Sequence, residues 1–242
     1  MSNNYLSHNE IIEAVRQGEI KIAYYTVEQA SKLAERRYVK VDPSPLDDDI
    51  DKRIRAYFLS NVQPDSLTIH VGPYASVEDA KAKERRGQVE VRNGQTILNI
   101  AKTGRILLAA GEFSLIGSNE YIAVGKKIGA SLCANVRNTD VGLSHISTII
   151  DPTWEGKLQI GITNTTKVSK ELEYLDALCI ARFHRLSQEV PATVADKFRS
   201  ERPHYGLDWW SVERDKGRSY FPVRKEYEEN ESGDRRNKAE LR

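Results

Sequence analysis

Residues 142–156 read GLSHISTIIDPTWEG, and this stretch decides the fold. A run rich in β-branched residues over 146–150 ends at Asp151, and a second strand-like run follows Gly156. Aspartate and proline are favoured at the first two positions of a turn, because the aspartate side chain bonds nearby backbone and the proline ring presets φ. The residues alone therefore predict a β-hairpin, with Asp151 capping the turn and Trp154 packing against the core.

Short strand-like segments separated by turn residues lie on both sides of this turn. Each is apolar or alternates apolar and polar residues with period two. They cover Leu67–Val71, Gln95–Ile100, Arg105–Leu108, Phe113–Ile116, Lys157–Ile162 and Leu178–Leu186. Because glycines punctuate the intervening stretches, the pattern favours a β-sandwich or barrel over a parallel sheet.

The first sixty residues have a helical pattern. Ser7 and Glu10 form a capping box before an apolar stripe, Thr26 opens a second candidate helix that runs to about Arg37, and Asp47 to Phe58 forms a third. We expect a single domain over 1–242, made of a helical N-terminal part (1–60) and a β core (61–190). A docked, aromatic-rich C-terminal segment (191–227) and a mobile tail (228–242) complete the expected organisation.

Composition excludes several classes of protein. The 242 residues include 36 basic and 35 acidic side chains, a net charge of +1, which argues against a nucleic-acid polymer as partner. No apolar run reaches the roughly 18 residues that a membrane span needs, and the polar start lacks the pattern of a signal peptide. Because Cys133 and Cys179 lie inside apolar segments, we expect reduced thiols and a cytoplasmic protein.

Common catalytic motifs are absent from the sequence. There is no P-loop, GxSxG or strand-linked GxGxxG pattern, and neither CxxC nor HExxH occurs. The five histidines are scattered, so we expect no zinc site and no other protein-held metal. An acidic helix N-terminus explains Asp47–Asp49 without a bound cation.

Four segments, in order, resemble the dCTP deaminase and dUTPase superfamily, and most closely its dCTP deaminase branch. Residues 150–156 (IDPTWEG), with Asn164, are similar to its central hairpin motif, and residues 6–22 to its opening helix and strand. Residues 61–72 (NVQPDSLTIHVG) are similar to its strand motif xxQPxSxDxRxG. Residues 110–122 are similar to its PGEFxLxxTxEyxxxP segment.

The resemblance implies a mainly β, dUTPase-like distorted jelly-roll or β-clip with N-terminal helices, assembled as a homotrimer with interfacial nucleotide sites. It places Asp151 on the deoxyribose 3′-hydroxyl, or on an attacking water. Backbone groups of Ser147, Thr148 and Ile149 would read the pyrimidine, and Trp154 stands at an aromatic position of the dUTPase branch. The implied ligands are dCTP or dUTP, with Mg²⁺ carried on the triphosphate.

Two family positions differ in this chain. The deaminase branch has an acid/base glutamate five residues after the motif's final glycine, where this chain has Gly161. Its RSSLAR segment corresponds here to residues 135–140, so that the second arginine falls on Asp140. Arg137 and Asn138 are the remaining candidates for substrate binding on the phosphate side.

His145 is a candidate replacement for the missing glutamate, because histidine is the side chain that normally titrates near neutral pH. The alternative is a structural histidine. The sequence thus predicts dCTP deaminase-like hydrolysis giving dUTP and ammonia, with Asp151 and His145 as catalytic residues. It leaves open a non-catalytic homologue that binds a nucleotide or a protein, and a dUTP diphosphatase.

Overall fold

The computed structural model describes residues 5–24, 37–38, 49–78, 88–92, 95–146, 148–191 and 193–194. Within these ranges the elements follow one another as α1 (His8–Arg16), β1 (Ile20–Tyr24), β2 (Arg37–Tyr38), α2 (Asp49–Asn61), β3 (Leu67–Glu78), β4 (Gln88–Arg92), β5 (Gln95–Asn99), α3 (Ile100–Thr103), β6 (Arg105–Leu108), β7 (Phe113–Val124), β8 (Ile128–Ala134), α4 (Val136–Asp140), β9 (Leu143–Ile146), β10 (Ile149–Ile150), β11 (Glu155–Asn164), β12 (Lys170–Glu173) and β13 (Ala177–Arg185).

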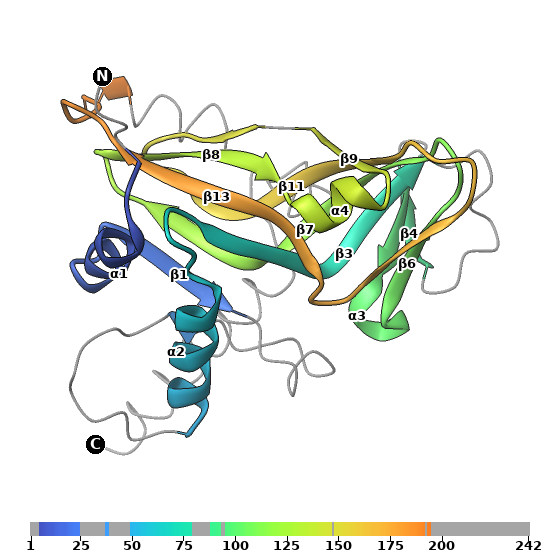
Figure 1. Cartoon of the computed structure of the whole chain (residues 1–242), viewed down its shortest axis with the longest axis horizontal. Coiled ribbons are helices and arrows are strands. Elements are labelled where there is room, and N and C mark those ends of the chain that lie inside the picture. The colour runs from blue at the N-terminus through green and yellow to red at the C-terminus, as the bar shows by residue number, and fades with distance from the viewer. Residues whose placement is uncertain are drawn as a thin grey trace, which may run out of the picture.

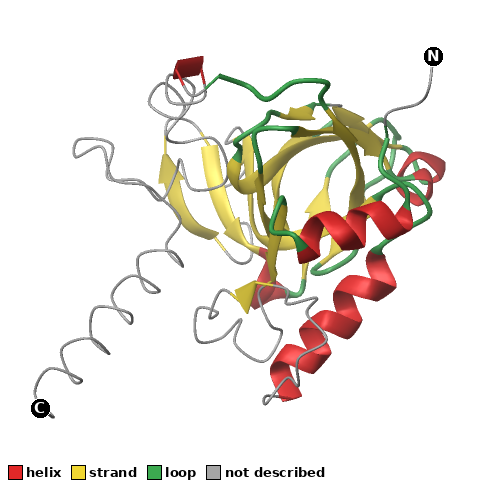
Figure 2. Ribbon diagram, turned by 90° about the vertical axis from the view of Figure 1, so that its left-hand side faces the viewer, coloured by secondary structure: helices red, strands yellow, loops and turns green. Residues whose placement is uncertain are grey.

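A large curled antiparallel sheet forms the body of the molecule (Figures 1 and 2). Its order is β10-β8-β13-β3-β7-β1-β2; β11 pairs with both β7 and β9, while β5 joins β4 to β3. β6 and β12 form a separate two-stranded sheet. Every strand pairing in the described ranges is antiparallel, which confirms the expected sandwich or barrel.

Helices α1 and α2 lie beside β1 at one end of this sheet (Figure 1). The predicted capping box is confirmed: the Ser7 backbone N–H donates to the Glu10 carboxylate at 2.8 Å. α1 buries Ile11, Ala14 and Val15. α2 confirms the third expected helix, which the structure describes over Asp49–Asn61 and which ends three residues later than expected. Residues 26–36 of the second lie outside the described residues. The strand β1 interrupts the helical N-terminal part and pairs with β7.

The expected hairpin at residues 151–156 is wrong in its pairing. A turn does join β10 to β11, but these two strands do not bond to each other: β10 pairs with β8, and β11 pairs with β7 and β9. β11 lies between these two partners, and its buried apolar side chains, Leu158, Ile160 and Ile162, stand at alternate positions. The turn therefore passes between two parts of the fold.

A wide bulge in β7 governs the register of the strands around it. Lys157 pairs with Tyr121, but Gln159 pairs with Gly117, so Leu158 alone faces the three residues Ser118–Glu120. Bulges of this kind leave backbone groups without their ladder partners and bend the strand. All three bulge residues are buried, so those backbone groups need partners from side chains.

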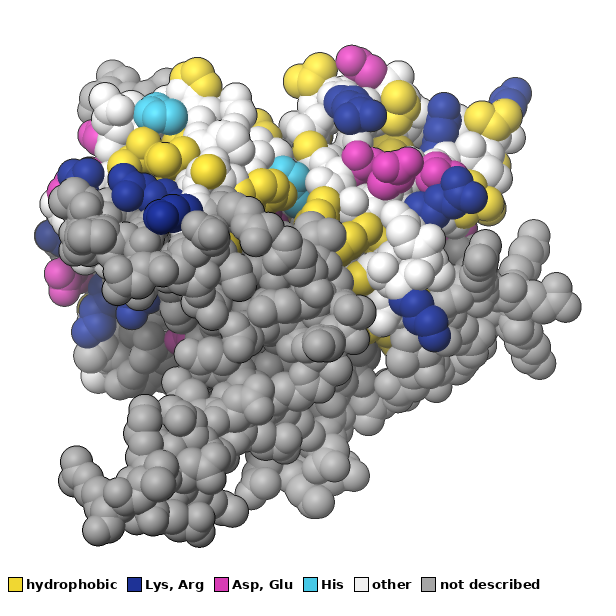
Figure 3. Space-filling model, turned by 90° about the horizontal axis from the view of Figure 1, so that it is seen from below, with side chains coloured by type: hydrophobic (Ala, Val, Ile, Leu, Met, Phe, Trp, Pro, Cys, Tyr) yellow, Lys and Arg dark blue, Asp and Glu magenta, His cyan; other side chains and the backbone are white. Residues whose placement is uncertain are grey.

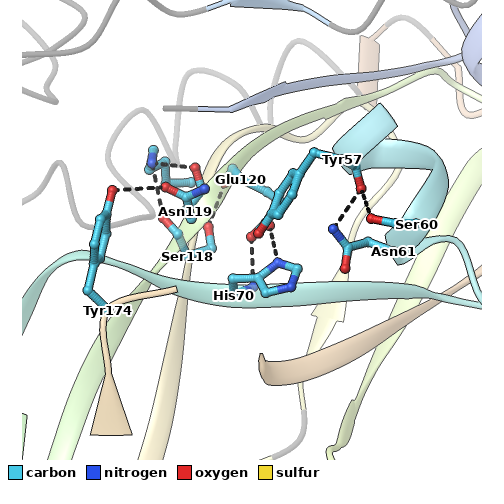
Figure 4. A network of polar contacts seen from close by, with 9 residues as sticks. Tyr57, Ser60, Asn61, His70, Ser118, Asn119, Glu120 and Tyr174 are labelled. Atoms are coloured by element: carbon cyan, nitrogen blue, oxygen red, sulfur yellow. Dashed lines mark hydrogen bonds and ion pairs between the residues drawn. The ribbon is translucent and has the colours of Figure 1, made fainter. Parts of the chain in front are cut away.

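Glu120 points from this bulge into a buried polar cluster with His70 of β3 (Figure 4). Its carboxylate accepts the His70 backbone N–H at 2.9 Å and lies 2.7 Å from ring atom Nδ1. The Tyr57 ring of α2 packs against the His70 ring, with centroids 5.3 Å apart. Burial, reinforced by the Glu120 charge, raises the pKa of Tyr174 to about 12 and also raises the pKa of the Cys179 thiol. The cluster thus joins α2 to β3 and β7.

Apolar side chains from most of the strands, and from α1 and α2, form one continuous core. On the face seen from below, basic and acidic side chains of the described residues lie among apolar ones (Figure 3). No helix in the described ranges is both long enough and apolar enough to span a bilayer.

A substitution at Gly72 tests whether β3 lies as close to the bulge as the structure shows. A Cβ there would lie 2.4 Å from the Ser118 carbonyl oxygen and 2.6 Å from that of Gly117, and both are backbone atoms. We expect Gly72→Ala to lower the free energy of unfolding by about 2–3 kcal/mol or more in a denaturant titration. The matched control is Gly125→Ala, whose Cβ would meet nothing closer than 3.4 Å. Equal stability of the two variants would contradict the packing at Gly72.

Candidate functional site

The turn after β10 carries the sequence motif and is strained. The Trp154 N–H donates to the Asp151 carbonyl at 3.0 Å, which closes a four-residue turn with Pro152 second and Thr153 third. Thr153 has a φ of 69°, a left-handed conformation that a β-branched residue rarely adopts and that costs on the order of 1–2 kcal/mol. Strained residues of this kind cluster at functional sites.

Contacts with the end of β7 hold the strained turn in place. The Thr153 N–H donates to the Gly125 carbonyl at 3.3 Å, and the Val124 N–H donates to the Trp154 carbonyl at 2.9 Å. The Thr153 side chain is buried, whereas Asp151 and Trp154 are partly exposed. Trp154 packs against the core, as the sequence predicts, but its buried indole N–H has no hydrogen-bond partner in the described part of the chain. The turn is thus anchored and leaves Asp151 accessible.

Two apolar side chains fill the space beside Gly161. A Cβ on this glycine would lie 3.0 Å from Ile146 Cδ1 and 3.0 Å from Phe113 Cε2. Gly161 sits in β11, opposite Ile146 of β9 and Leu115 of β7. The small residue lets these strands pack closely, which is the usual reason for a glycine inside a strand. Any side chain at this position would require the ends of the Ile146 and Phe113 side chains to shift by a few tenths of an ångström.

His145 faces away from Gly161. Directly paired residues of antiparallel strands project to the same side of the sheet, and His145 pairs with Ile162, whereas Ile146 pairs with Gly161. Both ring nitrogens of His145 are buried, and neither has a hydrogen-bond partner among the residues that the structure describes. Burial lowers the pKa of His145, which favours the neutral ring. The structure does not place this ring where a glutamate at 161 would reach.

The expected base-reading strand is only partly described, because Ser147 lies outside the described residues. The Thr148 carbonyl accepts the Leu132 N–H at 2.8 Å, and Ile149 pairs with Ser131 of β8. Backbone groups along one edge of this segment therefore already bond to β8. The Ile149 side chain is 62% exposed, so the segment remains at the surface.

The phosphate-side candidates lie on α4. Asn138 is buried, and its amide donates to the carbonyls of Ala177 and Leu178 at 2.9 and 3.0 Å, which fixes α4 to β13. Arg137 is exposed. α4 follows the end of β8, four residues beyond the Ala130 that pairs with Ile150, or about 13 Å of strand. The structure therefore does not bring Arg137 against the Asp151 turn.

Some residues that shape the site were not singled out from the sequence. Lys157 is completely buried next to the β7 bulge, and Thr153 carries the strain of the turn. A signal for Lys157 was a charged residue at the start of an otherwise apolar strand. Nothing in the residue pattern signals a positive φ at a threonine. In the described ranges, no three His, Cys, Asp or Glu side chains gather as metal ligands would.

The curled antiparallel sheet and the anchored Asp-Pro turn define a mainly β protein with a candidate ligand site on a turn. Residues 44–186, more than half of the chain, match the family model described as dCTP deaminase-like. The chain therefore belongs to the dCTP deaminase-like family, a family of nucleotide metabolism, which confirms the expected family and fold class.

Solved structures with related folds include the 2′-deoxycytidine 5′-triphosphate deaminase from Agrobacterium tumefaciens, at 15% identity and a TM-score of 0.49. The match covers 82% of this chain but only 53% of that one, so this chain spans about half of its length. The dUTPase from Streptococcus mutans matches at 15% identity, covering 52% of this chain and 81% of that one, with a TM-score of 0.35.

A mutant dUTPase of Staphylococcus aureus phage phi11, described with a structural Mg(II) ion, matches at 12% identity and a TM-score of 0.33. That match covers 48% of this chain and 94% of the dUTPase. No curated protein sequence matches the chain significantly.

His145 gives a pH-dependent prediction. Since burial lowers its pKa, the unfolded chain binds the proton more readily than the folded one. Its contribution to stability is complete above the unfolded pKa of about 6.5 and is lost as the pH falls below it, by at most about 1.4 kcal/mol per pH unit. We expect His145→Leu to reduce the loss of unfolding free energy between pH 7 and 5. Identical pH slopes in the variant and the wild type would contradict the burial of this ring.

Proposed function

We propose that this chain binds a pyrimidine deoxynucleoside triphosphate, dCTP or dUTP, through the Asp151 turn. The anchored and strained turn is the observation that carries this proposal, because strain persists only where the surroundings impose it. The partly exposed Asp151 would accept the 3′-hydroxyl of the sugar through its carboxylate, as the family resemblance implies. Thr148 and Ile149, with Ser147, would lie along the base, and Trp154 beside the turn.

Binding without turnover is the function that the local geometry favours. Deamination needs a group that moves protons beside the reacting base, and loss of such a group typically costs about 10²–10⁴ in rate. Gly161 has no side chain that could do this and packs closely against Ile146 and Phe113, and the candidate replacement, His145, projects from the other face of the sheet. The proposed role is that of a nucleotide sensor or reservoir.

Hydrolysis of dCTP to dUTP and ammonia is the second candidate, and the family match over residues 44–186 favours it. Asp151 would then hold the 3′-hydroxyl of the sugar. In the dUTP diphosphatase alternative it would also orient the attacking water, as the resemblance implies for that branch. In either case Mg²⁺ would arrive on the triphosphate, whose charge it neutralises.

Assembly into a homotrimer belongs to the same proposal. Ile146 and Ile149, at either end of the base-reading segment, are 55% and 62% exposed, and Val136 of α4 is 74% exposed. Apolar surface of this kind commonly marks a contact with another chain. A second copy that covers this face could bring Arg137 to the phosphates bound at a neighbouring Asp151 turn.

We further propose a single cytoplasmic domain without a nucleic-acid polymer as ligand.

Nucleotide titration tests the proposed function. We expect dCTP or dUTP with Mg²⁺ to raise the melting temperature of the wild type, as any ligand of the folded state does. Asp151→Ala should weaken binding at least tenfold by calorimetry, a difference of about 1.4 kcal/mol. Glu173→Ala, at an exposed carboxylate of β12, is the matched control and should bind as the wild type does.

Chromatography of the same mixtures separates the two candidates. Intact nucleotide after prolonged incubation is the expected result. Formation of dUTP from dCTP, or of dUMP from dUTP, would show an enzyme and overturn the proposal of binding without turnover. Absence of any binding by the wild type would reject the nucleotide site altogether. A light-scattering mass equal to one 27.4 kDa chain would reject the trimer.

A further inference from the structure

Lys157 is a lysine with no exposed surface at all, which is rare unless the amino group is fully bonded. It stands in β11, three residues after Trp154 of the strained turn. Its Nζ donates to the Ser118 carbonyl at 3.0 Å and to the Asn119 carbonyl at 2.7 Å. One side chain of β11 therefore bonds two successive carbonyls of the β7 bulge.

These bonds replace those that the bulge removes from the ladder. Leu158 faces three residues of β7 and cannot bond all of them with its backbone. The Leu158 N–H donates instead to the Ser118 hydroxyl oxygen at 2.9 Å, and that hydroxyl donates to the Glu120 carbonyl at 2.6 Å. The bulge is thus held by two side chains, Lys157 from β11 and Ser118 from β7.

Only a short stretch of paired residues between β7 and β11 separates the bulge from the turn. Glu155, Gly156 and Lys157 pair with Ala123, Ile122 and Tyr121, and the turn follows directly on the N-terminal side. The Tyr121 hydroxyl donates to the Glu155 carboxylate at 2.8 Å within this paired stretch. If the bulge shifted by one residue, every side chain in this paired stretch would move to the opposite face of the sheet. Its register, and with it the place of the turn, therefore depends on the bulge.

We propose that Lys157 is a positioning residue that fixes the Asp151 turn in its binding geometry through the β7 bulge. The proposal rests on the nucleotide site proposed above, since it assigns to Lys157 the placement of that site's main ligand. The strained Thr153 conformation needs such an external constraint, because a free turn would relax to a conformation without positive φ.

The test compares Lys157→Met, which keeps the length of the stem, with Lys157→Arg, which keeps the donors. Amide hydrogen exchange of the nucleotide-free protein reports on the turn through Thr153, Trp154 and Val124. We expect Lys157→Met to speed exchange at these amides at least tenfold, with little change in β6 and β12, and to weaken dCTP or dUTP binding about tenfold. Lys157→Arg should restore both properties towards wild type. Lys167→Met, at an exposed lysine, is the matched control and should change neither.

Unchanged exchange at the turn in Lys157→Met, with unchanged affinity, would overturn the proposal. Exchange that rises equally throughout the protein would also overturn it, because Lys157 would then stabilise the fold without selecting the turn. If Lys157→Met fails to fold, Ser118→Ala replaces it, since it removes the other support of the bulge and should give the same local pattern. Failure of the wild type to bind either nucleotide would reject the proposed function, while the exchange comparison would still decide the role of Lys157.

Discussion

The bonds from the Lys157 amino group to two carbonyls of the β7 bulge are the constraint on which the surrounding structure depends. The bulge breaks the register between β7 and β11, and β3 breaks register against β7 at the same level. Gly72 permits the close approach of β3, while Glu120 turns inward to His70. Burying a polar group costs free energy unless the group finds a hydrogen-bond partner. This arrangement therefore specifies the register of the strands more strictly than apolar packing alone would.

The geometry of the candidate site depends on the buried β7 bulge and the residues that bond to it. The turn at Asp151 is not a hairpin tip, because the strands on either side of it pair elsewhere. Its strain at Thr153 is balanced by bonds to Gly125 and Val124, just beyond the bulge. Gly161 packs closely against Ile146 and Phe113, at the position where the family resemblance implies an acid/base glutamate. The proposed binding without turnover rests on the combination of the anchored Asp151 turn with this closely packed position.

Sequence patterns were sufficient for the local elements and for the family. The capping box at Ser7 and the period-two runs predict α1 and most strands of the core correctly, because these depend on neighbours in the chain. The pairing of β10 with β8 could not be predicted, since it depends on contacts distant in sequence. His70 and Glu120 lie in two of the segments that carry the family resemblance, yet only the structure brings them within 2.7 Å. Whether Asp151 and the other predicted site residues bind a ligand stays a prediction.

The most direct test of the account is a crystal structure of the chain grown with dCTP and Mg²⁺. We predict a nucleotide whose 3′-hydroxyl lies within hydrogen-bond distance of the Asp151 carboxylate, with Thr153 still at positive φ. We also predict that Ile146 and Phe113 remain packed on Gly161, so that no protein acid/base group reaches the cytosine amino group from that side. A nucleotide bound away from Asp151, or His145 turned to contact the base, would contradict it.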